Sequence, residues 1–236
     1  VEGFARLMLL NHVMCPAMFS ELALLFFNPM TEDDQQLRQC LSVFFPAFAF
    51  SSSAHGMIIE AAFLPTLRKV LHASKTSPLH AVKDIAVARF FLYYTSQEEG
   101  AKPSEEEESI HNMLGIKVLN EMISNPKGQE CKVLASVLSM INLDNITPLA
   151  IQNMFVLTEM LGDSVSNRVL QKKICDFKVK LSDINNDAEL TAEQRSALEL
   201  ATEQHMQHRK EEVSVASHPS CTCTSIPRMY KGFRWQ

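Results

Sequence analysis

Glycine is scarce in this sequence of 236 residues. It has 7 Gly and 10 Pro, whereas Gly alone usually makes up roughly 7% of a chain. So few glycines argue against turn-dense β sandwiches and against the glycine-rich loops that bring the backbone close to phosphates. Uninterrupted apolar runs of the roughly 18–20 residues that cross a membrane are also missing. We therefore expect an all-α protein with no membrane partner.

Motifs for catalysis and for cofactor or metal binding are missing as well. The chain has no GxGxxG, GK[ST], GxSxG, HExxH or CxxC sequence, and its six cysteines stand singly apart from Cys221 and Cys223. His205 and His208 could face one metal ion from a single helix, but no further Cys or His ligand lies near them. We predict no enzyme, no catalytic residue, no cofactor and no metal site.

The formal net charge of −5 comes from one short segment. Residues 98–108 hold six Glu and one Lys, which accounts for the whole acidic excess. A run of this kind is typical of a solvated linker. The rest of the chain is neutral on average, and a neutral average is compatible with a basic face.

Proline and short polar clusters divide the chain into segments of helical length, whose apolar residues recur at three- and four-residue spacing. Four antiparallel pairs result, namely 16–27 with 31–50, 54–73 with 79–97, 109–123 with 129–141, and 149–161 with 164–181. The pairs begin about 38 to 55 residues apart, which brackets the roughly 40–47 residues of a HEAT or armadillo unit. Because a lone helical hairpin cannot bury both faces, we predict an α-solenoid of stacked pairs; a compact irregular bundle is the alternative.

The expected domain organisation follows from these segments. HEAT-like repeats cover 1–97 and further helix pairs cover 109–182, with the acidic linker 98–108 between them. A polar terminal helix at 187–213 follows, and the segment 214–236 has no periodicity and is expected to be disordered.

Local signals add detail to the first pair. Thr31 is expected to cap a new helix, with Glu32, Asp33 and Asp34 placing negative charge at its positive end. Pro46 is expected to kink or end this helix. Phe44, on its apolar face, is predicted to be buried.

Basic residues on helices are the remaining candidates for contacts with DNA or a protein partner. The final helix of the fourth pair is the most basic, and a sparser set lies on the second pair; the candidates are Arg168, Lys172, Lys173, Arg68, Lys69, Lys83 and Arg89. Such residues could neutralise phosphates along one edge of a solenoid, although a solvated helix face is the simpler interpretation. The segment from Arg228 to Trp235 also mixes cations with aromatic residues.

Two sites match the minimal pattern of a proline-directed kinase. Ser77 and Thr147 each precede a proline at a predicted turn between helices. A phosphate there would meet a helix N-terminus and be favoured electrostatically, although Ser/Thr-Pro also simply starts helices.

One block of the chain resembles a known family. The block reads FFNPMTEDD at 26–34 and LRQCLSVFFP at 37–46, preceded by EGFARLML at 2–9 and followed by AAFLPTL at 61–67. It is similar to the HEAT-repeat subunit of condensin that pairs with a kleisin, the condensin subunit 3 or CAP-G family. The resemblance covers about residues 2–97.

The resemblance implies a non-catalytic scaffold subunit of a complex that condenses mitotic chromosomes. The ATPase would reside in partner SMC subunits, and the HEAT subunit would bind the kleisin subunit and, with it, double-stranded DNA. The implied location is the nucleus and chromosomes, with a cytoplasmic pool during part of the cell cycle.

Two other functions remain open at this point. A generic HEAT-repeat adaptor, for nuclear transport or cohesin-type regulation, would bind proteins without contacting DNA. A helical enzyme would need a polar pocket lined by several acids or histidines with shifted pKa values.

Overall fold

The computed structural model describes residues 1–96, 109–143, 146–162 and 164–185, all within the unit Val1–Leu198. Over these residues every regular element is a helix. The acidic linker 98–108, the expected helix 187–213, the segment 214–236 and the pair His205 and His208 lie outside the described residues.

Nine α-helices and two short 3₁₀ helices make up the described part of the chain. In chain order they are α1 (Glu2–Leu9), α2 (Pro16–Phe27), η1 (Pro29–Thr31), α3 (Gln35–Ala49), α4 (Ser53–Leu71), η2 (Pro78–Ala81), α5 (Asp84–Thr95), α6 (Ile110–Ser124), α7 (Cys131–Met140), α8 (Pro148–Gly162) and α9 (Arg168–Asn185).

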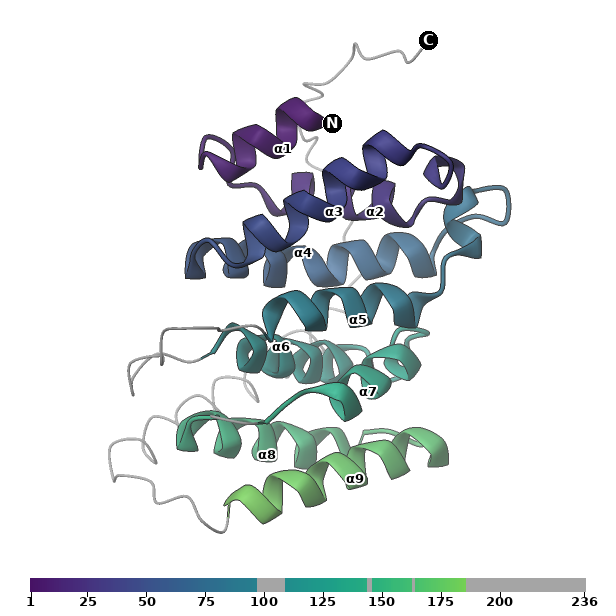
Figure 1. Ribbon diagram of the computed structural model, residues 1–236. Coiled ribbons are helices and arrows are strands. Elements are labelled where there is room, and N and C mark those ends of the chain that lie inside the picture. The colour runs from purple at the N-terminus through teal and green to yellow at the C-terminus, as the bar shows by residue number, and fades with distance from the viewer. Residues whose placement is uncertain (97–108, 144–145, 163, 186–236) are drawn as a thin grey trace, which may run out of the picture. The chain divides into compact units, whose positions relative to one another are not determined.

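The helices alternate between two layers (Figure 1). The first layer consists of α2, α4, α6 and α8, in which each helix packs against the next. The second layer consists of α3, α5, α7 and α9, and α1 packs on its α3 end. Successive helices cross from one layer to the other as pairs, as the segment pattern predicts. The prediction of an α-solenoid of stacked antiparallel pairs is confirmed.

The core lies between the layers and is rich in phenylalanine. Phe19 of α2 is fully buried and its ring centroid lies 5.5–6.3 Å from those of Phe44, Phe45, Phe48 and Phe91. Three of these rings come from α3, so one first-layer side chain fixes the neighbouring second-layer helix. Phe44 is 2% exposed, which confirms its predicted burial.

The predicted cap at Thr31 is wrong. The Thr31 hydroxyl donates to the carbonyl oxygens of Leu25 (2.6 Å) and Asn28 (2.9 Å), so it closes the end of α2. Pro29 starts the 3₁₀ turn η1, and α3 begins only after it. There Asp34 is the cap, because its carboxylate accepts from the Leu37 N–H at 2.9 Å.

Proline does not end either helix that contains it. Pro46 lies inside α3 and Pro65 inside α4. A proline in a helix interior costs about 3 kcal/mol or more. Phe44, Phe45 and Phe48 are buried on both sides of Pro46, so packing outweighs that cost.

No single described helix is both long and apolar enough to cross a membrane. The helices α3 and α4 meet the length and composition criteria only when taken together, and they are bent by 118° at their junction.

Candidate partner interface

Every charged side chain on the four first-layer helices forms an ion pair with another residue of the chain. There are seven of them, namely Glu21, Glu60, Arg68, Lys69, Lys117, Glu121 and Glu159. Lys117 of α6 contacts Glu60 of α4 at 2.8 Å, and Lys69 of α4 contacts Glu21 of α2. These pairs connect successive repeats.

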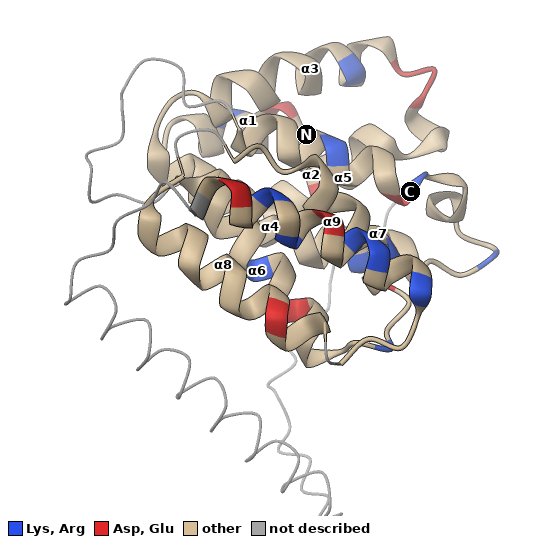
Figure 2. Cartoon of the chain, turned by 90° about the horizontal axis from the view of Figure 1, so that it is seen from below, with Lys and Arg blue, Asp and Glu red and all other residues tan. Residues whose placement is uncertain are grey.

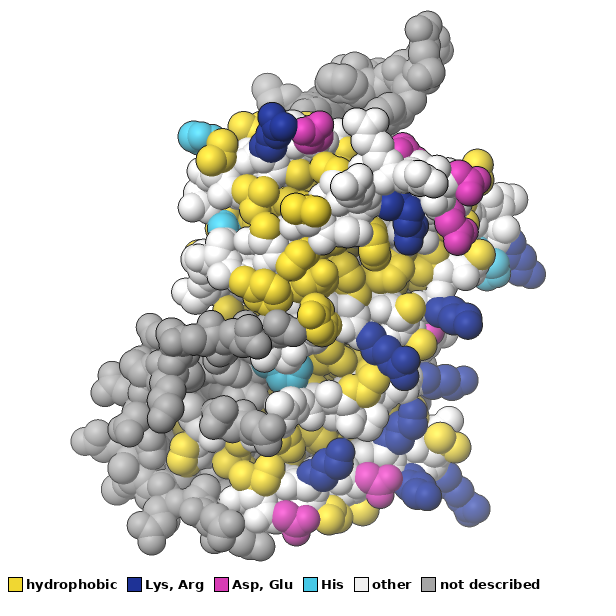
Figure 3. Space-filling view, viewed as in Figure 1, with side chains coloured by type: hydrophobic (Ala, Val, Ile, Leu, Met, Phe, Trp, Pro, Cys, Tyr) yellow, Lys and Arg dark blue, Asp and Glu magenta, His cyan; other side chains and the backbone are white. Residues whose placement is uncertain are grey.

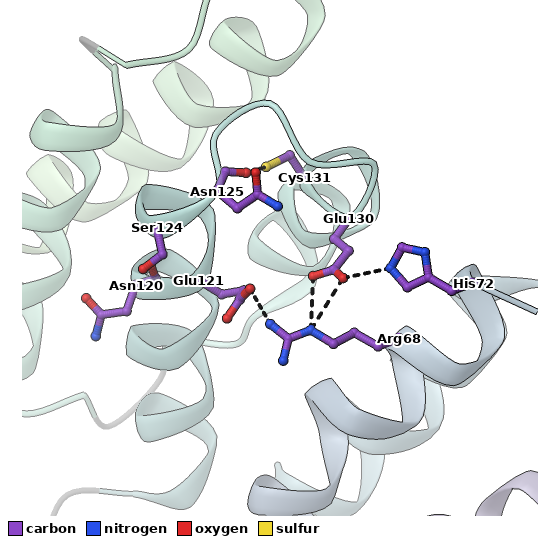
Figure 4. Close-up of polar contacts among 8 residues, drawn as sticks. All are labelled: Arg68, His72, Asn120, Glu121, Ser124, Asn125, Glu130 and Cys131. Atoms are coloured by element: carbon purple, nitrogen blue, oxygen red, sulfur yellow. Dashed lines mark hydrogen bonds and ion pairs between the residues drawn. The ribbon is translucent and has the colours of Figure 1, made fainter. Parts of the chain in front are cut away.

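The most extensive of these connections is the cluster of Arg68, His72, Glu121 and Glu130 (Figure 4). Arg68 pairs with Glu121, and its Nε lies 3.3 Å from Glu130 Oε1, which also lies 3.2 Å from His72 Nε2. The hydrogen bond that Arg68 donates to the Glu121 carboxylate is the main cause of a raised pKa at Arg68. The cluster joins α4 to α6 and to the residue before α7. The Glu130 carboxylate at its centre is largely buried, because the residue is only 9% exposed.

The second layer has a different charge distribution. Its four helices carry eight Lys or Arg and three Asp or Glu, namely Arg38, Arg89, Lys132, Arg168, Lys172, Lys173, Lys178 and Lys180 against Asp84, Asp176 and Asp183. Among these, Lys178 alone forms an ion pair with a described residue, at 2.9 Å from Glu159. Figure 3 shows Lys and Arg gathered down one side of the face that carries α5, α7 and α9.

Neutral groups hold some of these second-layer cations. Lys173 Nζ donates to Ser136 Oγ at 2.7 Å, and Arg38 lies over the Phe26 ring, 4.9 Å from its centroid. Arg89, Lys132 and the exposed Arg168 and Lys172, in contrast, form no ion pair with a described residue. Their charges are therefore not neutralised by any described side chain.

The predicted contact residues therefore separate into two groups. Arg68 and Lys69 lie in the first layer, where they connect repeats. Arg168, Lys172, Lys173 and Arg89 lie in the second layer, and Lys83 precedes α5. Lys173 contacts Ser136 and Lys180 contacts Ser139, so the packed helices α7 and α9 run in the same direction. This register places Lys132, one turn before Ser136, at the level of Arg168 and Lys172. Figure 2 shows the Lys and Arg residues of these two helices close to one another in the view from below.

A pocket of about 330 Å³ opens where α5 and α7 end and α6 begins. It is lined by Arg89, Leu92, Tyr93, Ser96, His111, Met140 and Asn142. We call it the helix-end pocket. Among the described residues no Asp or Glu lines it, and the one described histidine there, His111, is 6% exposed.

His111 is held as a neutral imidazole. Its Nε2 accepts from the Asn142 N–H at 3.0 Å, so the ring proton is on Nδ1, which lies 3.2 Å from Thr95 Oγ1. The Thr95 hydroxyl in turn donates to the Phe91 carbonyl oxygen at 2.9 Å. Burial lowers the pKa of His111 to about 4. Its role is to join the ends of three helices.

The remaining reactive groups have structural surroundings. Within the described residues, no three His, Cys, Asp or Glu side chains are grouped closely enough to hold a metal ion. Burial raises the pKa of the Cys131 thiol, which donates to the Asn125 carbonyl oxygen at 3.0 Å, so this thiol is a poor nucleophile. Ser77 Oγ accepts from the Leu79 N–H, and Thr147 Oγ1 from the Ala150 N–H at the start of α8.

Comparisons with known proteins identify the family. Residues 1–143 match the family model described as the C-terminal domain of nuclear condensing complex subunits. The chain is 32% identical over 219 residues to condensin complex subunit 3 of Homo sapiens, covering 90% of this chain, and 32% identical over 179 residues to that of Xenopus laevis, covering 72%. The chain belongs to the condensin subunit 3 family.

The match concerns one part of these relatives. The chain spans 21% of the human protein and 17% of the Xenopus protein. Its fold is similar to that in the crystal structure of the S. pombe condensin Cnd3–Cnd2 subcomplex, with a TM-score of 0.62 and 22% identity over 79% of this chain and 26% of that chain. The family resemblance of the block at 26–46 is thereby confirmed.

Two features of this condensin subunit 3 segment could not be identified from the sequence. Lys132 is the only charged residue of α7, and only the packing of α7 against α9 brings it to the level of Arg168 and Lys172. The helix-end pocket consists of residues from three separate segments, between 89 and 142. No local motif indicates either feature.

Proposed function

We propose that this chain is a non-catalytic scaffold segment of a condensin complex, acting on chromosomes in the nucleus during mitotic condensation. It binds the kleisin (Cnd2 or CAP-H type) subunit and contacts double-stranded DNA, while SMC partners supply the ATPase. Membership of the condensin subunit 3 family supports the complex, and the Cnd3–Cnd2 subcomplex, which has a similar fold, supports the choice of kleisin.

The observation that carries the DNA contact is the difference in charge between the layers. First-layer charges are neutralised by neighbours, whereas Lys132, Arg168 and Lys172 lie on the adjacent helices α7 and α9 without ion-pair partners among the described residues. Cations of this kind release condensed counterions when they meet phosphates, which provides sequence-independent affinity.

The spacing of the helices suits a duplex. Packed helices lie about 8–10 Å apart, so α5, α7 and α9 extend over roughly 20 Å. Double-stranded DNA carries one charge per about 1.7 Å of axis. A stretch of about six base pairs would therefore meet cations from more than one repeat. Lys173 and Lys180, which donate to neutral oxygens of Ser136 and Ser139, would face the same phosphates.

The test is duplex DNA binding measured by fluorescence anisotropy at several salt concentrations. Replacing Lys132, Arg168 and Lys172 together by Gln should weaken binding and reduce the slope of log K against log salt by about 3, close to 0.9 per lost contact. The control is Lys75→Gln, an exposed cation in the turn after α4. No binding at low salt, or an unchanged slope in the triple variant, would reject the DNA contact and favour the alternative, a HEAT-repeat protein adaptor.

A further inference from the structure

Exposed aromatic side chains lead across the second layer to the helix-end pocket. Phe50, just after α3, is 47% exposed and Tyr93 of α5 is 53% exposed. Tyr94 connects them, because its ring centroid lies 6.2 Å from that of Phe50 and 5.0 Å from that of Tyr93. We call these three residues the aromatic strip. Hydrophobic side chains are visibly grouped over α3 and α5 in Figure 3.

The pocket at the end of the strip has both apolar and polar lining residues. Leu92 and His111 are each 6% exposed, and both ring nitrogens of His111 already have partners. Because its pKa is about 4, His111 is neutral near pH 7 and offers no charge to an anion. Leu92, Tyr93 and Met140 offer apolar contacts to an aliphatic or aromatic side chain, and the volume of about 330 Å³ lies at the lower end of the range for ligand pockets.

The rim of the pocket adds a positive charge. Arg89, four residues before Tyr93 on α5, is exposed and forms no ion pair with a described residue. An arginine beside an exposed tyrosine is typical of the residues that dominate protein–protein affinity. The positive charge of Arg89 also attracts a carboxylate and repels an amine on a peptide whose side chain enters the pocket.

These contacts favour a peptide over a nucleic acid. A duplex presents a hydrated, charged backbone, which would leave Phe50 and the apolar residues of the pocket without apolar contacts. The unpaired cations Lys132, Arg168 and Lys172, which carry the proposed DNA contact, lie on α7 and α9, away from the α3 side of the strip. The apolar strip with a single arginine matches the interface type in which aromatic and Arg side chains are enriched.

We propose that the aromatic strip and the helix-end pocket bind an acidic peptide segment of the Cnd2-type subunit, with one large apolar side chain in the pocket and a carboxylate on Arg89. The identity of the partner rests on the proposed function. The surface itself rests on the contacts, exposure and charge of residues 50 to 142.

The experiment uses the whole chain and fluorescent 15-residue peptides that tile the Cnd2-type subunit of the same organism. We expect the tightest peptide to carry Asp or Glu within a few positions of Leu, Ile, Met or Phe. Tyr93→Ala should weaken it at least tenfold, as should Arg89→Glu. Tyr93→Phe should keep most of the affinity, because the ring rather than the hydroxyl forms the strip. Thermal melts check that each variant folds.

Matched controls distinguish binding at this surface from nonspecific binding of the peptide elsewhere on the chain. Phe4→Ala removes a ring that is 50% exposed on α1, and Lys75→Glu reverses an exposed charge outside the strip; neither should change peptide binding. The proposal is overturned if no peptide binds, if Tyr93→Ala has no effect, or if Tyr93→Ala weakens duplex DNA binding instead. Failure of the full Cnd2-type subunit to co-purify with the wild-type chain would reject the kleisin part of the proposed function. Co-purification that Tyr93→Ala leaves intact would reject the surface alone.

Discussion

Every charged side chain on α2, α4, α6 and α8 is held by an ion pair. Of the eleven charged side chains on α3, α5, α7 and α9, only Lys178 forms an ion pair with a described residue. The two layers bury the same core from opposite sides, so hydrophobic packing does not explain the difference. We infer a division of roles, in which first-layer charges hold successive repeats in register and second-layer charges face a partner. Substitutions in the shared core and at charges of each layer test this division.

The largest effect is expected at Phe44, the α3 ring that packs on Phe19 of α2. Phe44→Ala removes a side chain that is 2% exposed and leaves a cavity between the layers. Large-to-small aromatic substitutions of this kind cost about 3–5 kcal/mol. Urea denaturation should show a loss of this size. Val43→Ala, at a position that is 65% exposed in the same helix, should change the free energy of unfolding by less than about 0.5 kcal/mol.

The next effect concerns His111, which joins α6 of the first layer to α5 and α7 of the second. Its folded pKa is about 4, below the ordinary value of 6.5, because burial disfavours the charged ring. The unfolded chain therefore binds the extra proton first as the pH falls. The stability present above about pH 6.5 should be lost between pH 6.5 and 4, by an amount on the order of 3 kcal/mol.

The measurement for His111 is the free energy of unfolding at several pH values, compared with that of His111→Gln. The amide of Gln can replace the imidazole contacts without titrating, so the variant should lose less stability over this range. The pKa of His55 is also lowered by burial, so part of the dependence remains in the variant. Identical pH profiles in the two proteins would contradict the assignment.

The sequence predicts the layers better than it predicts the charges. Helix pairs and the burial of Phe44 follow from apolar spacing and from breaks such as Asn28-Pro29, all of which are local. Arg68 and Lys172 look alike in sequence, since each is a cation on a helix. What distinguishes them is a carboxylate from another repeat, because Arg68 meets Glu121, 53 positions away. Contacts at that separation depend on the register of stacked repeats, which helical periodicity does not specify.

The smallest effect, and the sharpest comparison between the layers, is expected at Glu130. Glu130→Gln removes the carboxylate charge that holds Arg68 and His72 in one cluster, yet it keeps the size of the side chain. Hydrogen bonds to charged groups contribute about 1.5–3 kcal/mol, and the partial exposure of Arg68 reduces this. We expect a loss of about 1 kcal/mol in the free energy of unfolding, measured by urea denaturation at low salt and smaller at high salt.

The matched second-layer change is Lys172→Gln, which removes an exposed charge that has no ion-pair partner among the described residues. Its effect on the free energy of unfolding should be within about 0.5 kcal/mol, or slightly stabilising, because Arg168 and Lys173 are neighbouring cations. The same substitution should weaken duplex DNA binding, which Glu130→Gln should not. If Lys172→Gln destabilised the chain as much as Glu130→Gln did, the second-layer cations would be structural and the division between the layers would be wrong. Opposite responses of the two variants in the two assays are what distinguish a charge that holds repeats together from a charge that meets a partner.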